Sequence, residues 1–140
     1  MTPSLVTSAP LAHLRWEAAA PLAGRPVVLM LHGVGGGRAA WDLSGTGAAL
    51  AAAGFTALAA DFPGYGLSAP VQPYDLAGMA GAVIDTLAAL GAVPAVLVGH
   101  SMGGMVAQEV VARAPQAVAG LVLAGTSPAF GKPGGDWQQA

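Results

Sequence analysis

Four short apolar runs divide the chain, and they limit its possible folds more than any other feature of the sequence. They cover 27–31, 56–60, 95–98 and 121–124, and each is followed at once by Gly, Asp or His. The runs are too short for helices, and their continuous apolar character is typical of strands that are buried on both faces. We therefore expect them to form the parallel strands of a central sheet.

Helical patterns lie between these runs. Asp75 is a good N-cap residue, and apolar residues recur at spacings of three and four over 76–90. A second apolar stripe covers 102–114, a weaker helix is expected over 48–53, and 11–19 is expected to be an edge strand. Strands that alternate with helices imply right-handed crossovers, so the predicted fold class is α/β, with a mostly parallel sheet and flanking helices.

The composition is that of a folded domain without an affinity for nucleic acid. Hydrophobic residues make up 54% of the 140 residues and charged residues 9%, which excludes disorder as the main state. The net charge is −2 and the five cations are scattered, so no basic stripe is available to bind phosphates. The sequence contains no cysteine, and a cytoplasmic location is the expected default.

The stretch 86–108 carries no charge and is long enough to cross a bilayer. Pro94, several glycines and the polar residues His100, Ser101 and Gln108 interrupt it. The beginning of the chain also lacks the basic start and apolar core of a signal peptide. We therefore expect no membrane span, because a buried parallel sheet produces the same local hydropathy.

The clearest chemical signal is the run GHSMGG at 99–104, between a predicted strand and a predicted helix. This is the G-x-S-x-G pattern, in which the central serine occupies a strained turn at the tip of a strand. In that turn the hydroxyl of Ser101 would project above the sheet as a nucleophile. The amide of Met102, at the helix N-terminus, would point at the oxyanion of a tetrahedral intermediate.

Two further motifs occur in order before this one: HGVGG at 32–36 and DFPGYGLS at 61–68. Together the three motifs resemble those of the α/β-hydrolase superfamily, and the resemblance covers about 11–124. It implies an α/β-hydrolase fold in which Val34 supplies the second oxyanion-hole amide. The residues after the last predicted strand look most like the enol-lactonase and carboxylesterase branch.

That resemblance implies a serine hydrolase that acts on a carboxylic ester or lactone through an acyl-enzyme on Ser101. It implies no metal and no organic cofactor, and a small-molecule substrate as the partner. Resembling hydrolases place the triad acid and then the histidine after the serine. Here His13, His32 and His100 all precede Ser101, and we interpret each of them as structural.

Asp136 follows Ser101, but it lies well beyond the last predicted strand, whereas a triad acid should lie near a strand end. We therefore expect residues 1–140 to be the N-terminal part of a single α/β-hydrolase domain that is incomplete at its C-terminus. The triad Asp and His would lie on downstream residues, and this chain alone would be inactive. Its last strand would then be an open edge. The sequence specifies no oligomeric state.

Two other interpretations compete with the hydrolase. The Gly-rich run 33–38 could be a dinucleotide-binding loop with Asp61 as the acid that binds the ribose, but Arg38 occupies the third glycine position. The second alternative is a non-catalytic hydrolase-like binding module or pseudoenzyme fragment. That alternative stays open at the level of sequence because no histidine follows Ser101.

Overall fold

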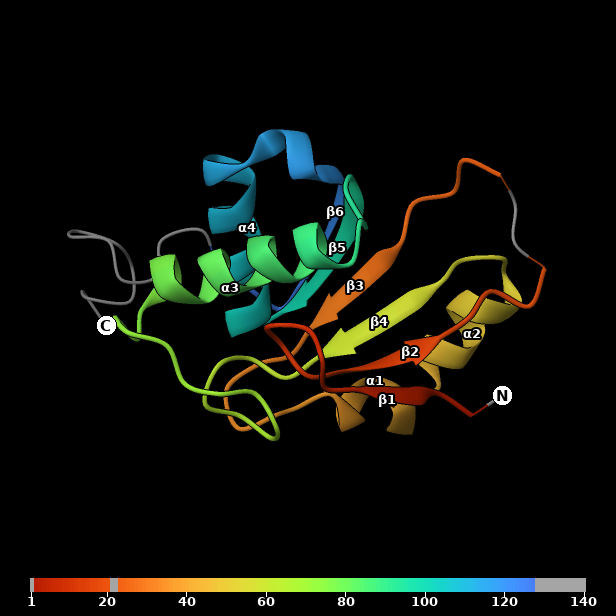
Figure 1. Cartoon of the computed structure of the whole chain (residues 1–140), viewed down its shortest axis with the longest axis horizontal. Helices are drawn as coiled ribbons and strands as arrows, with labels where there is room; N and C mark the ends of the chain where they lie inside the picture. The colour runs from red at the N-terminus through yellow and green to blue at the C-terminus, as the bar shows by residue number, and fades with distance from the viewer. Residues whose placement is uncertain (1, 21–22, 128–140) are drawn as a thin grey trace.

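The computed structural model of the chain describes residues 2–20 and 23–127. Six strands form one sheet in the order β1-β2-β4-β3-β5-β6 (Figure 1). Neighbouring strands pair in parallel from β4 to β6, whereas β1 and β2 are antiparallel to their neighbours. The predicted apolar runs are the parallel strands. The six strands are β1 (Ser4–Val6), β2 (His13–Trp16), β3 (Val28–Leu31), β4 (Ala57–Ala60), β5 (Ala95–His100) and β6 (Val118–Ala124).

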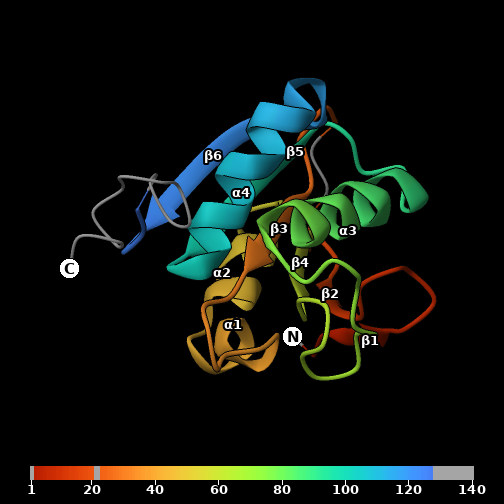
Figure 2. The same cartoon turned by 90° about the vertical axis from the view of Figure 1, so that its left-hand side faces the viewer.

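Helices cover both faces of the sheet. On one face lie α3 (Leu76–Ala89) and α4 (Met102–Arg113), and on the other lie α1 (Ala39–Leu43) and α2 (Thr46–Ala52) (Figure 2). A short 3₁₀ helix, η1 (Pro115–Ala117), leads into β6. The three predicted helices are confirmed. The short helix α1 was not predicted, because it lacks the usual signals of a helix. No side chain caps its N-terminus, and none of its five residues is buried.

The start of α3 shows how the sequence sets a helix boundary. The backbone of Asp75 is extended, and its carboxylate accepts a hydrogen bond of 2.7 Å from the amide of Gly78. This bond satisfies one of the amides that have no partner in the first turn of a helix. The predicted N-cap is therefore confirmed.

The expectation that 11–19 forms an edge strand is wrong. The strand in this segment, β2, pairs with β1 on one side and with β4 on the other, so it is an inner strand. Both His13 and Trp16 are fully buried there. The sequence predicted no strand before 11–19, whereas in the structure β1 pairs with β2 and is itself the edge.

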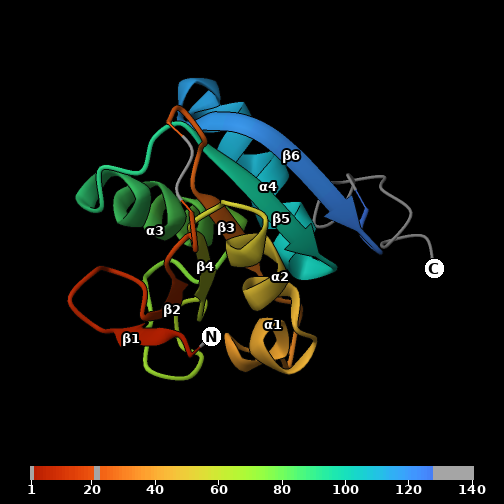
Figure 3. The same ribbon diagram turned by 90° about the vertical axis from the view of Figure 1, so that its right-hand side faces the viewer.

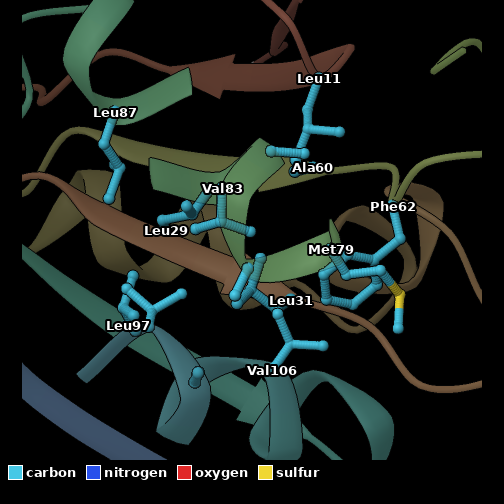
Figure 4. Close-up of a cluster of buried hydrophobic side chains, with 14 of the residues drawn as sticks. Leu11, Leu29, Leu31, Ala60, Phe62, Met79, Val83, Leu87, Leu97 and Val106 are labelled. Carbon is cyan, nitrogen blue, oxygen red and sulfur yellow. The ribbon is translucent and has the colours of Figure 1, made fainter. Parts of the chain in front are cut away.

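The larger apolar cluster lies between the sheet and the helices α3 and α4. In Figure 4, Leu29 and Leu97 from the sheet lie close to Val83 of α3, and Leu31 lies close to Val106 of α4. All five side chains are completely buried. Full burial of one such side chain stabilises the fold by about 1.5 to 3 kcal/mol.

A smaller cluster lies on the opposite face, under α2. Trp16, Met30 and Ala51 are at its centre. Helix α2 can approach the indole closely because Gly47 has no side chain: a Cβ there would lie 2.6 Å from the ring of Trp16. The two clusters together place the ends of β3, β4 and β5 at one edge of the sheet, where the three motifs of the sequence meet.

Within the described part of the chain, β6 is the last strand of the sheet and pairs only with β5 (Figure 3). Its apolar side chains are unusually exposed: Leu121 by 37%, Val122 by 51% and Leu123 by 43%. The strand contains no charge and no proline. An apolar edge of this kind leaves free N–H and C=O groups that can pair with another chain.

We therefore predict that residues 1–140, expressed alone, associate through β6. Val122→Lys should shift the protein toward the monomer, because a charged edge residue opposes strand pairing. Leu43→Lys is the matched control, since Leu43 is 86% exposed on α1, away from the edge. Size-exclusion chromatography with light scattering measures the outcome. A parent chain that is a monodisperse monomer would contradict the prediction.

Candidate active site

Ser101 occupies the single residue between β5 and α4, and its backbone is strained. Its φ is +54° and its ψ is −116°, and among residues 2–20 and 23–127 no other non-glycine residue has a positive φ. Such a conformation costs on the order of 1 to 3 kcal/mol and persists only where the surroundings impose it. The turn predicted from the GHSMGG motif is therefore present at the expected residue.

The glycines of this motif allow the strand and the helix to approach each other closely. A Cβ on Gly99 would lie 2.6 Å from the amide nitrogen of Gly104. A Cβ on Gly103 would lie 2.6 Å from the carbonyl carbon of Leu31 and 2.8 Å from the carbonyl oxygen of His32. Because these neighbours are backbone atoms, they cannot move aside as a side chain could. The glycines are therefore a steric requirement of the turn.

This contact predicts the effect of a larger residue at position 103. Gly103→Val should destabilise the fold by about 2 to 4 kcal/mol through overpacking and backbone strain. Gly81→Ala in α3 is the control, because a Cβ at Gly81 meets nothing within 4 Å. That substitution should be neutral or stabilise by up to about 1 kcal/mol. Thermal melts of both variants test the geometry, and an unchanged midpoint for Gly103→Val would refute it.

The loop 32–36 lies directly beside the strained turn. A Cβ on Gly33 would lie 3.2 Å from Cβ of Ser101 and 3.3 Å from Nδ1 of His100. Val34 follows in the same loop and is 74% exposed. Thus the structure brings the loop of Val34 to the turn that contains Ser101 and Met102, the other two predicted site residues.

His32 holds the beginning of this loop. Its Nδ1 lies 2.8 Å from the carbonyl oxygen of Gly33, and its Nε2 lies 3.0 Å from the amide nitrogen of Phe62. The amide can only donate, so Nε2 accepts and Nδ1–H donates, which fixes the neutral tautomer. The rings of Phe62 and Tyr65 flank the imidazole, each at a centroid distance of 4.9 Å. His32 therefore joins the loops that follow β3 and β4.

Burial lowers the pKa of His32 below its ordinary value of 6.5, although the Gly33 carbonyl and the Asp61 carboxylate act in the opposite direction. The folded protein then binds fewer protons at this site than the unfolded chain does once the pH falls below about 6.5. The contribution of neutral, buried His32 to the stability of the fold is therefore present in full above that pH and is lost progressively below it.

We accordingly predict that the thermal midpoint falls between pH 7.5 and pH 5, and that part of the fall comes from His32. His32→Asn introduces a side-chain amide, which can donate and accept hydrogen bonds but does not titrate. The variant should be less stable than the parent at pH 7.5 and should lose less stability than the parent on acidification. An equal loss in parent and variant would show that His32 does not contribute.

A partly buried ion pair organises the neighbouring loop. The guanidinium of Arg38 pairs with the carboxylate of Asp61, which is 1% exposed. The same carboxylate accepts from the amides of Arg38 at 2.8 Å and Leu67 at 3.2 Å. Its oxygens are thus engaged within the protein and are not presented to a ribose. The dinucleotide interpretation of this loop is therefore wrong, and sequence reasoning missed the role of Arg38.

The other titratable candidates do not meet at Ser101. His13 is buried in β2, where its Nδ1 lies 3.0 Å from the carbonyl oxygen of Leu11, and burial lowers its pKa. His100 ends β5 with its side chain exposed. Asp136 lies outside the described residues. In the part of the chain that the structure describes, no side chain hydrogen-bonds to the hydroxyl of Ser101.

A cavity of about 470 Å³ lies next to the turn. Its walls are the loop 32–36, residues of and around α1, and the ends of β5 and β6. Ser101 is not part of the wall, but its neighbours Gly33 and His100 are. Trp41 and Ala124 make the cavity largely apolar, while Ser44 and Thr46 add hydroxyl groups.

The described residues contain neither a candidate metal site nor a candidate membrane span. Across 2–20 and 23–127, no three His, Asp or Glu side chains are grouped so that they could hold a metal ion. In the same ranges, no helix has both the length and the apolar character that crossing a membrane requires.

The sheet is mostly parallel and is covered by helices on both faces, and a strained serine lies where a strand meets a helix. This is the arrangement of an α/β hydrolase. The chain belongs to the alpha/beta hydrolase fold family, whose sequence model matches residues 26–139. The fold expected from the three motifs is therefore confirmed.

Similar proteins are hydrolases and related enzymes. The chain is 40% identical over 109 residues to a pimeloyl-(acyl-carrier protein) methyl ester esterase of Chromobacterium violaceum, an overlap that covers 75% of this chain and 39% of the esterase. It is also 40% identical over 101 residues to the dihydrolipoyllysine-residue acetyltransferase component of the acetoin cleaving system of Cupriavidus necator, covering 71% of this chain and 26% of that protein. The chain thus spans well under half the length of these relatives.

Solved structures agree on the fold. A predicted CIB-like hydrolase from Thermoplasma acidophilum superimposes with a TM-score of 0.76 at 22% identity, covering 92% of this chain and 64% of that one. Epoxide hydrolase A from Mycobacterium thermoresistibile superimposes with a TM-score of 0.72 at 28% identity, covering 87% of this chain and 39% of that one.

Proposed function

We propose that the full-length protein is a serine hydrolase of carboxylic esters or lactones, with Ser101 as its nucleophile. The observation that carries this proposal is the strained backbone of Ser101 at the junction of β5 and α4. A fold retains strain of this kind at a site where geometry matters for function. The turn lies at the carboxyl end of an inner strand, so the hydroxyl of Ser101 would be able to meet a substrate there.

Two backbone amides would stabilise the charge that develops during the reaction. The amide of Met102 begins α4, where the helix dipole favours an anion. The amide of Val34 lies in the loop beside the turn. Donors of this kind act strongly because they are already oriented when the oxyanion forms.

The proposed reaction has two steps. In the first, Oγ of Ser101 bonds to the carbonyl carbon, its proton passes to a base, and the alcohol leaves with a proton to give an acyl-enzyme. In the second, water attacks the acyl carbon, the acid is released, and the hydroxyl of Ser101 is restored. For a lactone the leaving alcohol remains attached to the acyl group.

We propose that the base and the acid that orients it lie on residues beyond this sequence. Both nitrogens of His32 are engaged, the ring of His13 is buried in β2, and no histidine follows Ser101. The short overlap with the relatives supports this proposal, because the chain spans 39% of the esterase of Chromobacterium violaceum. That relative's name also favours an ester among the possible substrates.

A non-catalytic binding module is the second candidate. The apolar cavity of about 470 Å³ beside the turn favours it, because such a cavity could hold a small ligand. A binding module would need the cavity but would not need a reactive serine. The reactivity of Ser101 therefore separates the two candidates.

We predict that a fluorophosphonate probe labels the full-length protein at Ser101. Ser101→Ala should abolish labelling and lower kcat for a p-nitrophenyl ester by about 10⁶-fold, because the loss of a nucleophile leaves only the residual effect of the oxyanion hole. Ser8→Ala, at an exposed serine before β2, should retain both labelling and turnover. An adduct at another residue, or full turnover by Ser101→Ala, would overturn the proposal.

A further inference from the structure

Thr126 makes a contact with the candidate nucleophile that no sequence motif indicates. Its hydroxyl donates a hydrogen bond of 2.6 Å to the carbonyl oxygen of Ser101. Thr126 lies just after β6, so the bond connects the end of the last described strand to the turn between β5 and α4. Among residues 2–20 and 23–127, no other side chain hydrogen-bonds to the backbone of Ser101.

The backbone of Ser101 is held on both sides. Its amide donates to the carbonyl oxygen of Ala124 at 3.0 Å. Its carbonyl oxygen accepts from the amides of Gly104 at 3.0 Å and Met105 at 3.3 Å, in addition to the hydroxyl of Thr126. The two helix amides would be present at the start of any helix, whereas the bond from Thr126 is particular to this site.

The carbonyl of Ser101 and the amide of Met102 belong to one peptide group. A peptide group is planar, and in the trans form its C=O and N–H point in opposite directions. A bond that fixes the direction of the Ser101 carbonyl therefore also fixes the direction of the Met102 N–H. We propose that Thr126 is a positioning residue, which aims the Met102 amide at the oxyanion and maintains the strained backbone of the nucleophile.

The surroundings of Thr126 fit this role. A Cβ on Gly104 would lie 2.6 Å from Cβ, Cγ2 and Oγ1 of Thr126, so the glycine leaves the space that the threonine occupies. The amide group of Gln108 donates to the carbonyl oxygens of Gly104 at 3.1 Å and Ser127 at 3.4 Å. The segment after β6 is thus attached to the first turns of α4 at two points. These two hydrogen bonds fix the position of Thr126 relative to the turn.

The inference rests on the proposed function, and its test uses the full-length protein. Thr126→Val keeps the shape of the side chain but removes its hydroxyl, and Thr126→Ser keeps the hydroxyl. For Thr126→Val, the rate of fluorophosphonate labelling at Ser101 and kcat should both fall about tenfold, because a misaligned donor binds the transition state less well. KM should change little, since Thr126 acts through the peptide group, and Thr126→Ser should restore the rate.

Thr86→Val is the matched control. Thr86 is fully buried in α3, where its hydroxyl donates to the carbonyl oxygen of Ala82 at 2.8 Å and accepts from the amide of Leu11 at 3.0 Å, so the substitution removes buried hydrogen bonds away from the turn. It should lower the thermal midpoint without changing the labelling rate. If the parent is labelled at Ser101 and Thr126→Val matches its rate, the role of Thr126 is refuted. If the parent is not labelled at Ser101, the proposed function itself fails.

Discussion

The candidate site depends on the close approach of α4 to the backbone of β3. At Gly103 a Cβ would overlap the carbonyl groups of Leu31 and His32, so the helix lies directly against the end of the strand. This contact fixes where α4 begins and so forces the single residue between β5 and α4 into its strained backbone conformation. The position of Ser101 therefore follows from backbone packing and not from any interaction of its own side chain.

Around this contact, the loops at the carboxyl edge of the sheet are held by polar groups that are buried or partly buried within the protein. His32 connects the loop after β3 to the amide of Phe62, and Arg38 pairs with Asp61. The hydroxyl of Ser68 donates to the carbonyl oxygen of Asp61 at 2.7 Å and accepts from the amide of Ala12 at 3.0 Å. Buried polar groups that are fully paired favour one arrangement over others, because any alternative leaves a group unpaired at a cost of about 1 to 3 kcal/mol.

The side of the molecule near β6 is organised differently. Thr126 and Gln108 attach the segment after this strand to the turn and to α4, yet the strand leaves Leu121, Val122 and Leu123 partly exposed. The cavity beside the turn reaches the same side through His100 and Ala124. The cavity therefore borders β6 only at Ala124, the last residue of the strand.

The sequence alone predicted the four parallel strands, the helices α2, α3 and α4, and the strained turn. Continuous apolar runs predict buried strands, Asp75 predicts a helix start, and the glycines around Ser101 predict a close approach, because each signal depends on neighbouring residues. It did not reveal that β2 is an inner strand, that Arg38 pairs with Asp61, or that Thr126 bonds to Ser101. Those features join residues from distant parts of the chain and depend on the order of strands in the sheet. Only the tertiary structure, which brings the strand ends together, could decide them.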